Sequence, residues 1–510
     1  MKKLIAIMVV LTCVTGLFAG GIVTNLNQSA EYVRTLNRNA STGLDAVFYN
    51  PAGLSKLEDG LYLYLSNQSI IQVKGIDAKY PVPMNTTNFE GNTGVWVYPN
   101  IYLAMKMNKL TFSGGFMPIG GGGSAEYKDG LPSFESGVAQ LVPMLSQIGV
   151  NDYKYEVSFE GSSVYMGLQA GVTYELNEQF SVYGGGRFVN ASNSYEGYLK
   201  NMQVNPLGGA FMAPAPYFYA LRDQLAGGAA QMQPIIDAGA GSYTLAQLVG
   251  GGQMTQAQAE VIKQGIMQAA GLSAEQVDAM NVATLQGAYN AASSTMGATG
   301  DQLAVATADK ELEASQSGHG FCAIVGLNWS PNDDLNVGFR YESITKMTLK
   351  NDTKKNTTGV VSFDDGIEKG ADMPALAALG ISYKVTDKLR LETNFNYFFD
   401  PQVDWDGNED KLDNCMEFGL AAEYALNEKF IGSIGFLRSN TSSTEEYRSD
   451  LDYGLDSNTL GFGISYQFSE QLKLDFGALN TFYIDGKNAA GTEEYYKTTS
   501  VASIGMSYKF

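Results

Sequence analysis

The chain alternates apolar and polar residues in repeated short stretches from about residue 60 to its end, and the junctions between these stretches are alternately very short and very long. An apolar residue at every second position is typical of a β-strand with one apolar and one polar face. The short junctions are polar turns of two to four residues, at 108–109, 177–179, 331–334, 386–388, 427–429 and 469–471. Such turns between alternating stretches predict hairpins, so the six turns predict six pairs of strands.

One further strand near 61–73 and a last one near 495–510 raise the predicted number to fourteen. With this even number, both ends of the chain lie on the side of the short turns. Bacterial outer-membrane barrels have an even number of strands, short periplasmic turns and longer outer loops. We therefore predict an all-β fold, a fourteen-stranded antiparallel transmembrane β-barrel over residues 60–510.

The predicted strand 335–342 illustrates the two faces of such a wall. One face is apolar and the other is small, polar or charged: Leu335, Val337, Phe339 and Tyr341 against Asn336, Gly338, Arg340 and Glu342. A soluble β-sandwich also alternates in this way. It does not explain a regular rhythm of short and long loops over fourteen strands. We expect the apolar face to contact lipid and the polar face to line the lumen.

Composition excludes several classes of function. The chain has 33 Lys and Arg residues against 53 Asp and Glu residues, a formal net charge of -20, which argues against a nucleic-acid partner. Its single histidine, His319, has no convincing partner for nucleophilic or histidine-relay catalysis. The acidic turn at 332–334 lacks the spaced ligands of a calcium loop. We therefore predict no enzyme activity, no metal and no cofactor.

The first twenty residues have the pattern of a secretory signal peptide. Lys2 and Lys3 precede an apolar run from Leu4 to Val14, and small residues follow at Ala19 and Gly20. A signal peptide at 1–20 predicts export. Two cysteines then remain, Cys322 and Cys415, too few for a disulfide framework. The sequence leaves open whether they pair or have any function.

The last stretch of the chain alternates up to a terminal aromatic residue. Its apolar positions are Ala502, Ile504, Met506, Tyr508 and Phe510. This ending resembles the C-terminal signal that outer-membrane barrels present to the barrel assembly machinery, which we therefore expect to be a partner. The predicted location is the outer membrane of a Gram-negative bacterium, with outer-membrane lipid around the barrel.

Two regions do not fit the strand pattern, the segment before residue 60 and a segment at about 201–318 that is rich in Ala, Gly, Gln and Met. In the latter, Thr255 and Ser273 are each followed three residues later by Gln, which predicts capped helix starts, and Gly271 predicts a helix end. Val261, Ile262 and Ile266 are predicted to form one apolar face. We expect a helical insertion in an outer loop, either a surface cap or a surface that captures a hydrophobic ligand.

Three short segments before the first strand carry a family resemblance. They are 27–34 (NQSAEYVR), 39–42 (NAST) and 45–54 (DAVFYNPAGL). They resemble the hatch of the FadL family of outer-membrane transporters for long-chain fatty acids and other hydrophobic compounds. Asn50, Pro51 and Ala52 match the Asn-Pro-Ala element of that family, and 373–375 and 394–405 look similar to its later segments. The resemblance implies an N-terminal hatch, or plug, at 21–59, whereas the large helical insertion departs from the common pattern.

The third predicted strand, 109–123, is a candidate lateral gate. It contains Gly114, Gly115 and Pro118 and then four glycines at 120–123. Proline cannot donate to a ladder and glycine permits bends, so this strand is the one most prone to leave register. The FadL family has an inward kink in its third strand that opens a lateral exit, and this position corresponds to it.

Four arginines are candidate partners for a carboxylate of the cargo: Arg34 and Arg38 in the hatch, and Arg187 and Arg340 on the lumen face of the wall. Each of them can equally pair with a lumen carboxylate such as Glu342 or Glu392. The resemblance implies passive uptake of long-chain fatty acids or similar hydrophobic small molecules through the lumen and the lateral opening. The alternative is a structural or adhesive barrel that binds surfaces through its large loops. The sequence identifies neither the cargo and its chain length nor the oligomeric state.

Overall fold

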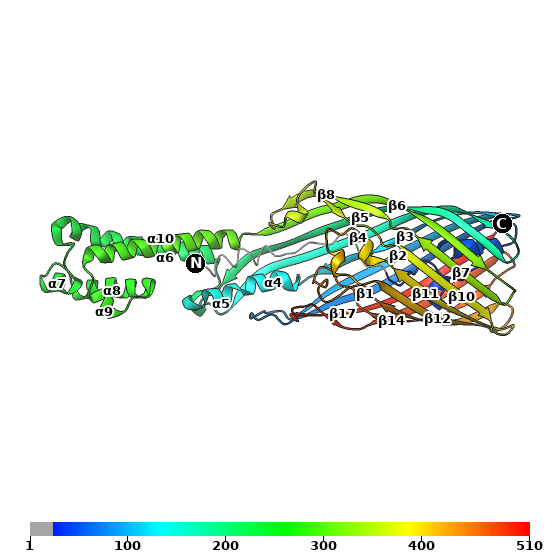
Figure 1. Ribbon diagram of the computed structural model, residues 1–510. Helices are drawn as coiled ribbons and strands as arrows, with labels where there is room; N and C mark the ends of the chain where they lie inside the picture. The colour runs from blue at the N-terminus through cyan, green and yellow to red at the C-terminus, as the bar shows by residue number, and fades with distance from the viewer. Residues whose placement is uncertain (1–23) are drawn as a thin grey trace. The chain divides into compact units, whose positions relative to one another are not determined.

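The computed structural model describes residues 24–510, so the predicted signal peptide lies outside the described residues. The chain divides into two compact units. Among the described residues, one unit comprises 24–136, 157–198 and 311–510, and the other comprises 137–156 and 199–310. The first unit contains most of the barrel, and the second contains most of the helices (Figure 1).

The fold class predicted from the sequence is confirmed, because fourteen strands form a closed antiparallel barrel. The barrel closes where the first strand pairs with the last. Its strands are β1 (Gly60–Ala78), β2 (Asn88–Met107), β3 (Leu110–Tyr127), β4 (Tyr153–Glu175), β5 (Phe180–Val204), β6 (Lys310–Trp329), β7 (Leu335–Glu342), β10 (Leu376–Lys384), β11 (Leu389–Phe398), β12 (Cys415–Ala425), β13 (Phe430–Asn440), β14 (Ser457–Gln467), β15 (Leu472–Tyr483) and β17 (Glu493–Lys509). Three short strands extend the sheet: β8 (Lys346–Asn356), β9 (Glu368–Gly370) and β16 (Gly486–Lys487).

All six predicted tight turns join neighbouring strands of the barrel. Their polar residues satisfy the turn backbone. The side chain of Asn427 accepts hydrogen bonds from the amides of Lys429 and Phe430, at 2.9 and 3.0 Å, and Asn177 and Asn332 act in the same way. Asn108 has φ of 52°, a left-handed conformation that asparagine tolerates in a two-residue turn.

The alternation of the strands places apolar side chains outside and polar ones inside. Leu168 and Ile434 expose 59% and 60% of their surfaces, whereas Gln169 and Thr173 on the other face of β4 are buried. An apolar outer face of this kind is what a lipid environment requires. No helix among the described residues is long and apolar enough to cross a membrane.

The helices between β5 and β6 have a hydrophobic core of their own. The segment outside these two strands spans 205–309, because both strands extend beyond the ends expected from the sequence. The helices of the second unit are α5 (Leu141–Leu145), η2 (Ser146–Ile148), η3 (Pro206–Gly208), α6 (Pro214–Ile235), η4 (Ile236–Ala240), α7 (Leu245–Gly250), α8 (Gln256–Ala270), α9 (Ala274–Asp278) and α10 (Val282–Ala306), and α4 (Pro132–Ala139) has residues in both units. Loops of the first unit contain η5 (Val361–Phe363), η6 (Asp400–Gln402) and η7 (Glu409–Lys411).

Both capped helix starts predicted from the sequence are present. Thr255 and Ser273 form capping boxes that begin α8 and α9, and Gly271 ends α8 with φ of 65°. Ile262 and Ile266 are buried as predicted, but the prediction for Val261 is wrong, because its side chain is 70% exposed. One residue corresponds to a rotation of about 100° on a helix, which turns Val261 away from the buried stripe.

The described part of the hatch, residues 24–59, lies inside the barrel (Figure 1). It forms α2 (Ala30–Thr35), α3 (Ala46–Tyr49) and η1 (Pro51–Lys56). Its apolar residues and those of the wall form one buried cluster, which includes Tyr32, Val33, Phe48 and Leu54 of the hatch with Tyr64, Tyr102, Met117 and Tyr165 of the wall. The lumen at the level of the hatch is therefore filled by protein.

Candidate functional site

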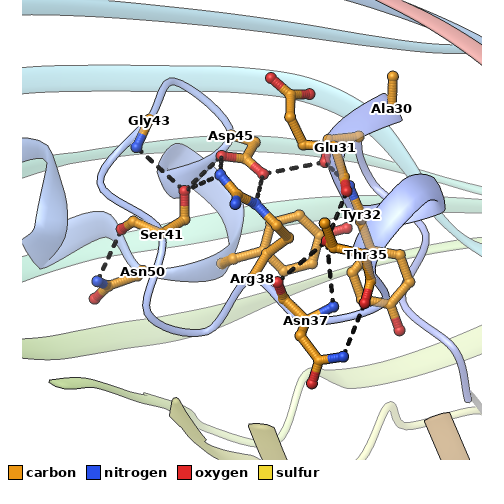
Figure 2. Close-up of polar contacts among 12 residues, drawn as sticks. Ala30, Glu31, Tyr32, Thr35, Asn37, Arg38, Ser41, Gly43, Asp45 and Asn50 are labelled. Atoms are coloured by element: carbon orange, nitrogen blue, oxygen red, sulfur yellow. Dashed lines mark hydrogen bonds and ion pairs between the residues drawn. The ribbon is translucent and has the colours of Figure 1, made fainter. Parts of the chain in front are cut away.

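The hatch is held in shape by its own polar residues (Figure 2). The hydroxyl of Ser29 caps α2 by accepting a hydrogen bond from the amide of Tyr32 at 2.9 Å. Arg38 donates two hydrogen bonds to the carboxylate of Asp45, at 2.6 and 2.9 Å, and Ser41 donates a third at 2.6 Å. Burial alone raises the pKa of Asp45, but Arg38 and Ser41 outweigh it and hold this pKa below its usual range.

Glycines on the lumen face of the wall leave room for the backbone of the hatch. A methyl group at Gly461 would lie 2.6 Å from the carbonyl oxygen of Val33, and one at Gly435 would overlap the carbonyl oxygen of Thr35. Seven of the eight barrel strands from β7 to β17, all except β11, carry a glycine that faces the hatch in this way, at Gly338, Gly380, Gly419, Gly435, Gly461, Gly477 and Gly505. We call these seven residues the glycine row. Along it, the hatch runs from Asn39 beside β7 to Ala30 beside β17.

Asn50, Pro51 and Ala52 bind the wall through polar contacts. The side chain of Asn50 donates to the carbonyl of Ser41 at 2.9 Å and to the side chain of Asn328 at 2.7 Å. The carbonyl of Pro51 accepts from Thr173 at 2.6 Å, and that of Ala52 accepts from Ser181 at 2.7 Å. This segment is therefore fixed to β4, β5 and β6.

Ion pairs form a second set of contacts between α2 and the wall. Arg34 pairs with Glu423 on β12 and with Asp475 on β15, the latter at 3.1 Å. Lys473 on β15 pairs with Glu31 of the hatch at 3.1 Å and with Asp475 at 3.0 Å. Burial, with a contribution from Asp475, raises the pKa of Glu31 to about 7. We call these five residues the ion-pair latch.

The four arginines predicted as partners for a cargo carboxylate are all buried beside carboxylates of the chain. Arg187 donates to both oxygens of Glu342, at 2.8 and 2.9 Å. Arg340 has Nε at 3.3 Å from the same carboxylate. The ring of Phe48 lies 4.9 Å from the guanidinium of Arg187 and 4.7 Å from that of Arg340. The structure thus favours the pairing that the sequence left open, with Glu342 as the partner of two arginines.

The ladder between β2 and β3 is interrupted. Asn92 pairs with Glu126, and the next recorded pair is Ile101 with Phe116, so the described residues 93–100 of β2 have no ladder partner on β3. On its other side β3 shifts register against β4 at Pro118 and again between Gly120 and Gly123. Gly121 and Gly123 have φ of 87° and 73°, which glycine adopts without strain. We call this interruption the ladder break.

The predicted gate residues differ in their position relative to the ladder break. Gly114 pairs with Leu103 and Ala170, and Gly115 pairs with Tyr102 and Gln169, so both lie in regular ladder. Pro118 lies where the register first shifts. The break therefore begins beyond the glycine pair, at two places where β3 has one residue more than β4, the first between Pro118 and Gly120 and the second between Gly120 and Gly123.

Two features of β2 border the ladder break. Trp96 and Val97 bulge from the strand, with side chains 69% and 71% exposed. The hydroxyl of Tyr98 spans the break, because it donates to the carbonyl of Pro118 at 2.7 Å and accepts from the side chain of Gln28 at 3.0 Å. A residue of the hatch is thus linked to the break by a single side chain.

Sequence reasoning missed the glycine row, the ion-pair latch and Tyr98. The glycine row had a visible signal, since glycines recur at lumen positions of every barrel strand from β7 to β17 except β11. The ion-pair latch had no such signal in the sequence, because alternation assigns a residue to a face of its strand but does not identify its neighbour on a distant segment.

The sequence matches no protein-family model and no curated protein. A FadL homologue from Pseudomonas aeruginosa resembles the structure with a TM-score of 0.56 and 13% identity, covering 96% of this chain and 100% of its own. The toluene transporter TodX of Pseudomonas putida has a TM-score of 0.52 and 14% identity, covering 97% of this chain and 100% of its own. Likeness at these identities establishes the fold, so the chain has the fold of the FadL-type barrels, as its resemblance to that family predicted.

Proposed function

We propose that this protein is an outer-membrane transporter for hydrophobic small molecules. The apolar outer face of the closed barrel supports a place in the membrane, and the alternating C-terminal strand supports delivery by the barrel assembly machinery. The named activity of the toluene transporter TodX supports a hydrophobic cargo. Long-chain fatty acids are the first cargo class to test.

The observation that carries the proposal is a plugged barrel with an interrupted wall. The hatch fills the lumen with packed side chains, so a straight aqueous path is obstructed at its level. The ladder break offers a sideways path between β2 and β3, and exposed apolar residues border it on the outer face. A hydrophobic molecule leaving there enters lipid and avoids water, which favours movement without an energy source.

The test is to close the ladder break. From Pro118 to Gly123, β3 advances five residues while its partners on β4 advance three, from Met166 to Ser163. Deleting Gly121 and Gly122 gives the two strands equal numbers of residues over this stretch and allows a regular ladder. In cells that lack their own fatty-acid transporter, we expect the deletion to reduce uptake of labelled oleate to the level of the empty vector, while heat-modifiable migration shows a folded barrel.

The matched control is Gly114→Ala. A methyl group there would lie 3.3 Å from the carbonyl oxygen of Gln169, and the residue already has partners on both sides. Its uptake should equal that of the parent. Folded deletion variants that still import oleate would refute the lateral path, and a parent that imports neither oleate nor toluene would refute the transport function.

A further inference from the structure

A groove lies on the outer face of the barrel wall, across the neighbouring strands β10 to β14 (Figure 1). Its volume is about 530 Å³, within the range of roughly 300–1,000 Å³ that is typical of small-molecule sites. The large side chains around it are apolar and exposed on the outer face: Ile381, Leu391, Leu420, Ile434 and Leu460. We call this depression the outer groove.

Two short side chains form the floor of the outer groove. Thr393 of β11 pairs with Leu420 in the ladder, and Ala422 of β12 pairs with Leu391 and Ile434. Residues directly opposite each other in a ladder lie on the same face of the sheet. A threonine or alanine beside leucine and isoleucine therefore leaves a depression that the chain itself does not fill.

The polar groups at this floor are already used. The hydroxyl of Thr393 donates to the carbonyl of Gly419 at 3.0 Å, within the wall. Glu392 also borders the groove, but its carboxylate accepts from the amide of Ala40 in the hatch at 3.2 Å, on the lumen side. A polar group placed on this floor would lose water and gain no hydrogen bond, which is unfavourable. The part of a ligand that fits here is hydrocarbon.

The outer groove lies towards the end of the barrel that carries the short turns. Leu391 follows Lys388 of the turn by three residues, a rise of about 10 Å along the strand. Tyr383 lines the groove two residues before that turn begins, at the level where membrane barrels carry an aromatic girdle. With the short turns in the periplasm, the groove faces the periplasmic leaflet of the membrane.

Two exposed lysines lie in the turns below the outer groove. The carbonyl of Lys388 accepts from the amide of Ala425 at the end of β12, and that of Lys429 accepts from the amide of Gln467 at the end of β14, both at 2.8 Å. These positions place the two lysines at the ends of strands that form the groove. Within residues 24–510 neither lysine forms an ion pair.

The charge of these two turns differs from that of other short turns. Asp387 pairs with Lys384 at 3.0 Å, which leaves Glu428 as the remaining acid against Lys388 and Lys429. The turns at 177–179, 331–334 and 469–471 contain acidic residues and no basic ones, in a chain of formal net charge -20. Basic residues at the membrane surface attract anionic lipid head groups. A positive rim below an apolar groove is thus complementary to an anionic lipid.

We propose that the outer groove binds one anionic phospholipid of the periplasmic leaflet. One acyl chain lies over Thr393 and Ala422, and Lys388 and Lys429 donate charge-assisted hydrogen bonds to the phosphate group. This proposal goes beyond the proposed transport of cargo and takes from it only the outer-membrane location.

The test compares two lipids that have the same acyl chains and different head groups. Retention of phosphatidylglycerol and of phosphatidylcholine is measured by native mass spectrometry on the purified protein in detergent. We expect the parent to retain one phosphatidylglycerol about tenfold more tightly than phosphatidylcholine. The double variant Lys388→Gln, Lys429→Gln should lose this difference, and Ala422→Phe, which fills the groove, should retain both lipids more weakly.

Matched controls change the same residue types elsewhere on the barrel. Lys109→Gln removes an exposed lysine from the turn between β2 and β3, and Ala170→Phe enlarges an exposed residue of β4. Both should retain lipid as the parent does, and heat-modifiable migration should show that every variant is folded. Glycerol 3-phosphate, a head group without chains, should not displace the lipid. Displacement at equal concentration would show a site for free phosphate and overturn the role of the groove.

The outcomes separate this proposal from the transport function. Equal retention of both lipids by the parent overturns the anionic head group, and unchanged retention in Ala422→Phe overturns the groove. A parent dimer that becomes monomeric in Ala422→Phe would show that a second copy of the chain, and no lipid, covers the groove. A parent that imports oleate and retains no lipid overturns this proposal alone, whereas one that retains phosphatidylglycerol and imports no cargo overturns transport alone.

Discussion

Replacing Arg34 by methionine should free the hatch without unfolding the barrel. Arg34 is the residue of α2 that reaches two carboxylates of the wall, Glu423 and Asp475. Removing one partner of a buried ion pair costs about 3–5 kcal/mol. Glu423 keeps Arg390 and Asp475 keeps Lys473, so we expect the lower end, about 3 kcal/mol. At about 1.4 kcal/mol per factor of ten, the displaced hatch should become roughly 100-fold more populated.

The assay is conductance in planar lipid bilayers. The wall behind the hatch carries small and polar residues such as Gly419 and Asn396, so water and ions enter wherever the hatch leaves. Arg34→Met should therefore spend a much larger fraction of time in conducting states than the parent. Unchanged heat-modifiable migration should show that the strands remain assembled.

Arg390→Met is the matched control for this experiment. It also removes one cation from Glu423, but Arg390 belongs to β11 and not to the hatch. After this substitution Glu423 still pairs with Arg34, so the hatch should stay in place. Equal conductance of the Arg34 variant and the parent, or an equal increase in both variants, would show that the ion-pair latch does not hold the hatch.

Two further predictions concern the contact between the hatch and the barrel wall. Gly435→Val should displace the hatch, because any side chain there overlaps the carbonyl oxygen of Thr35, whereas Gly432→Val, with its nearest atom at 3.9 Å, should not. Protease cleavage within 24–59 distinguishes the two variants, and equal resistance would contradict the role of the glycine row. The second prediction is a pH dependence, since the pKa of Glu31 is raised from 4.5 to about 7. Between these values the docked state binds a proton that the released state lacks, so the contribution of Glu31 to docking is largest near pH 5 and is lost as the pH rises through this window. Hydrogen exchange of the hatch amides, corrected for the intrinsic rate, should show less protection at pH 8 than at pH 5, and Glu31→Gln should abolish the difference.

The sequence was sufficient for the barrel and insufficient for its interior. Alternation and turn residues determine which stretches form strands and which face of each strand meets lipid, and both effects are local. The partner of a lumen residue depends on the register between strands and on the path of the hatch, which are set by packing over long sequence separations. For this reason Arg187 was assigned to the lumen from the sequence, whereas its pairing with Glu342 required the structure.

The same reasoning applies to the third strand. Its glycines and proline indicated a weak wall, because these residues lower the stability of a ladder wherever they occur. They did not locate the break, since Gly114 and Gly115 keep both partners while the register changes from Pro118 onward. The location depends on a mismatch in residue number between neighbouring strands, and no single strand contains that information.

The hatch and the ladder break, which together close the proposed path, are connected through the hydroxyl group of Tyr98. Gln28 is held in the lumen by Tyr102, which donates to its carbonyl at 2.6 Å, and by Asn100, which donates to its side chain at 2.8 Å. From there the side chain of Gln28 donates to Tyr98, and Tyr98 donates across the ladder break to Pro118. Pro118 lies where β3 shifts register against β4, and its carbonyl accepts this bridge from β2. A hatch movement that carries Gln28 away therefore removes a hydrogen bond from the hydroxyl group that spans the break, so we expect the position of the hatch to influence the proposed exit.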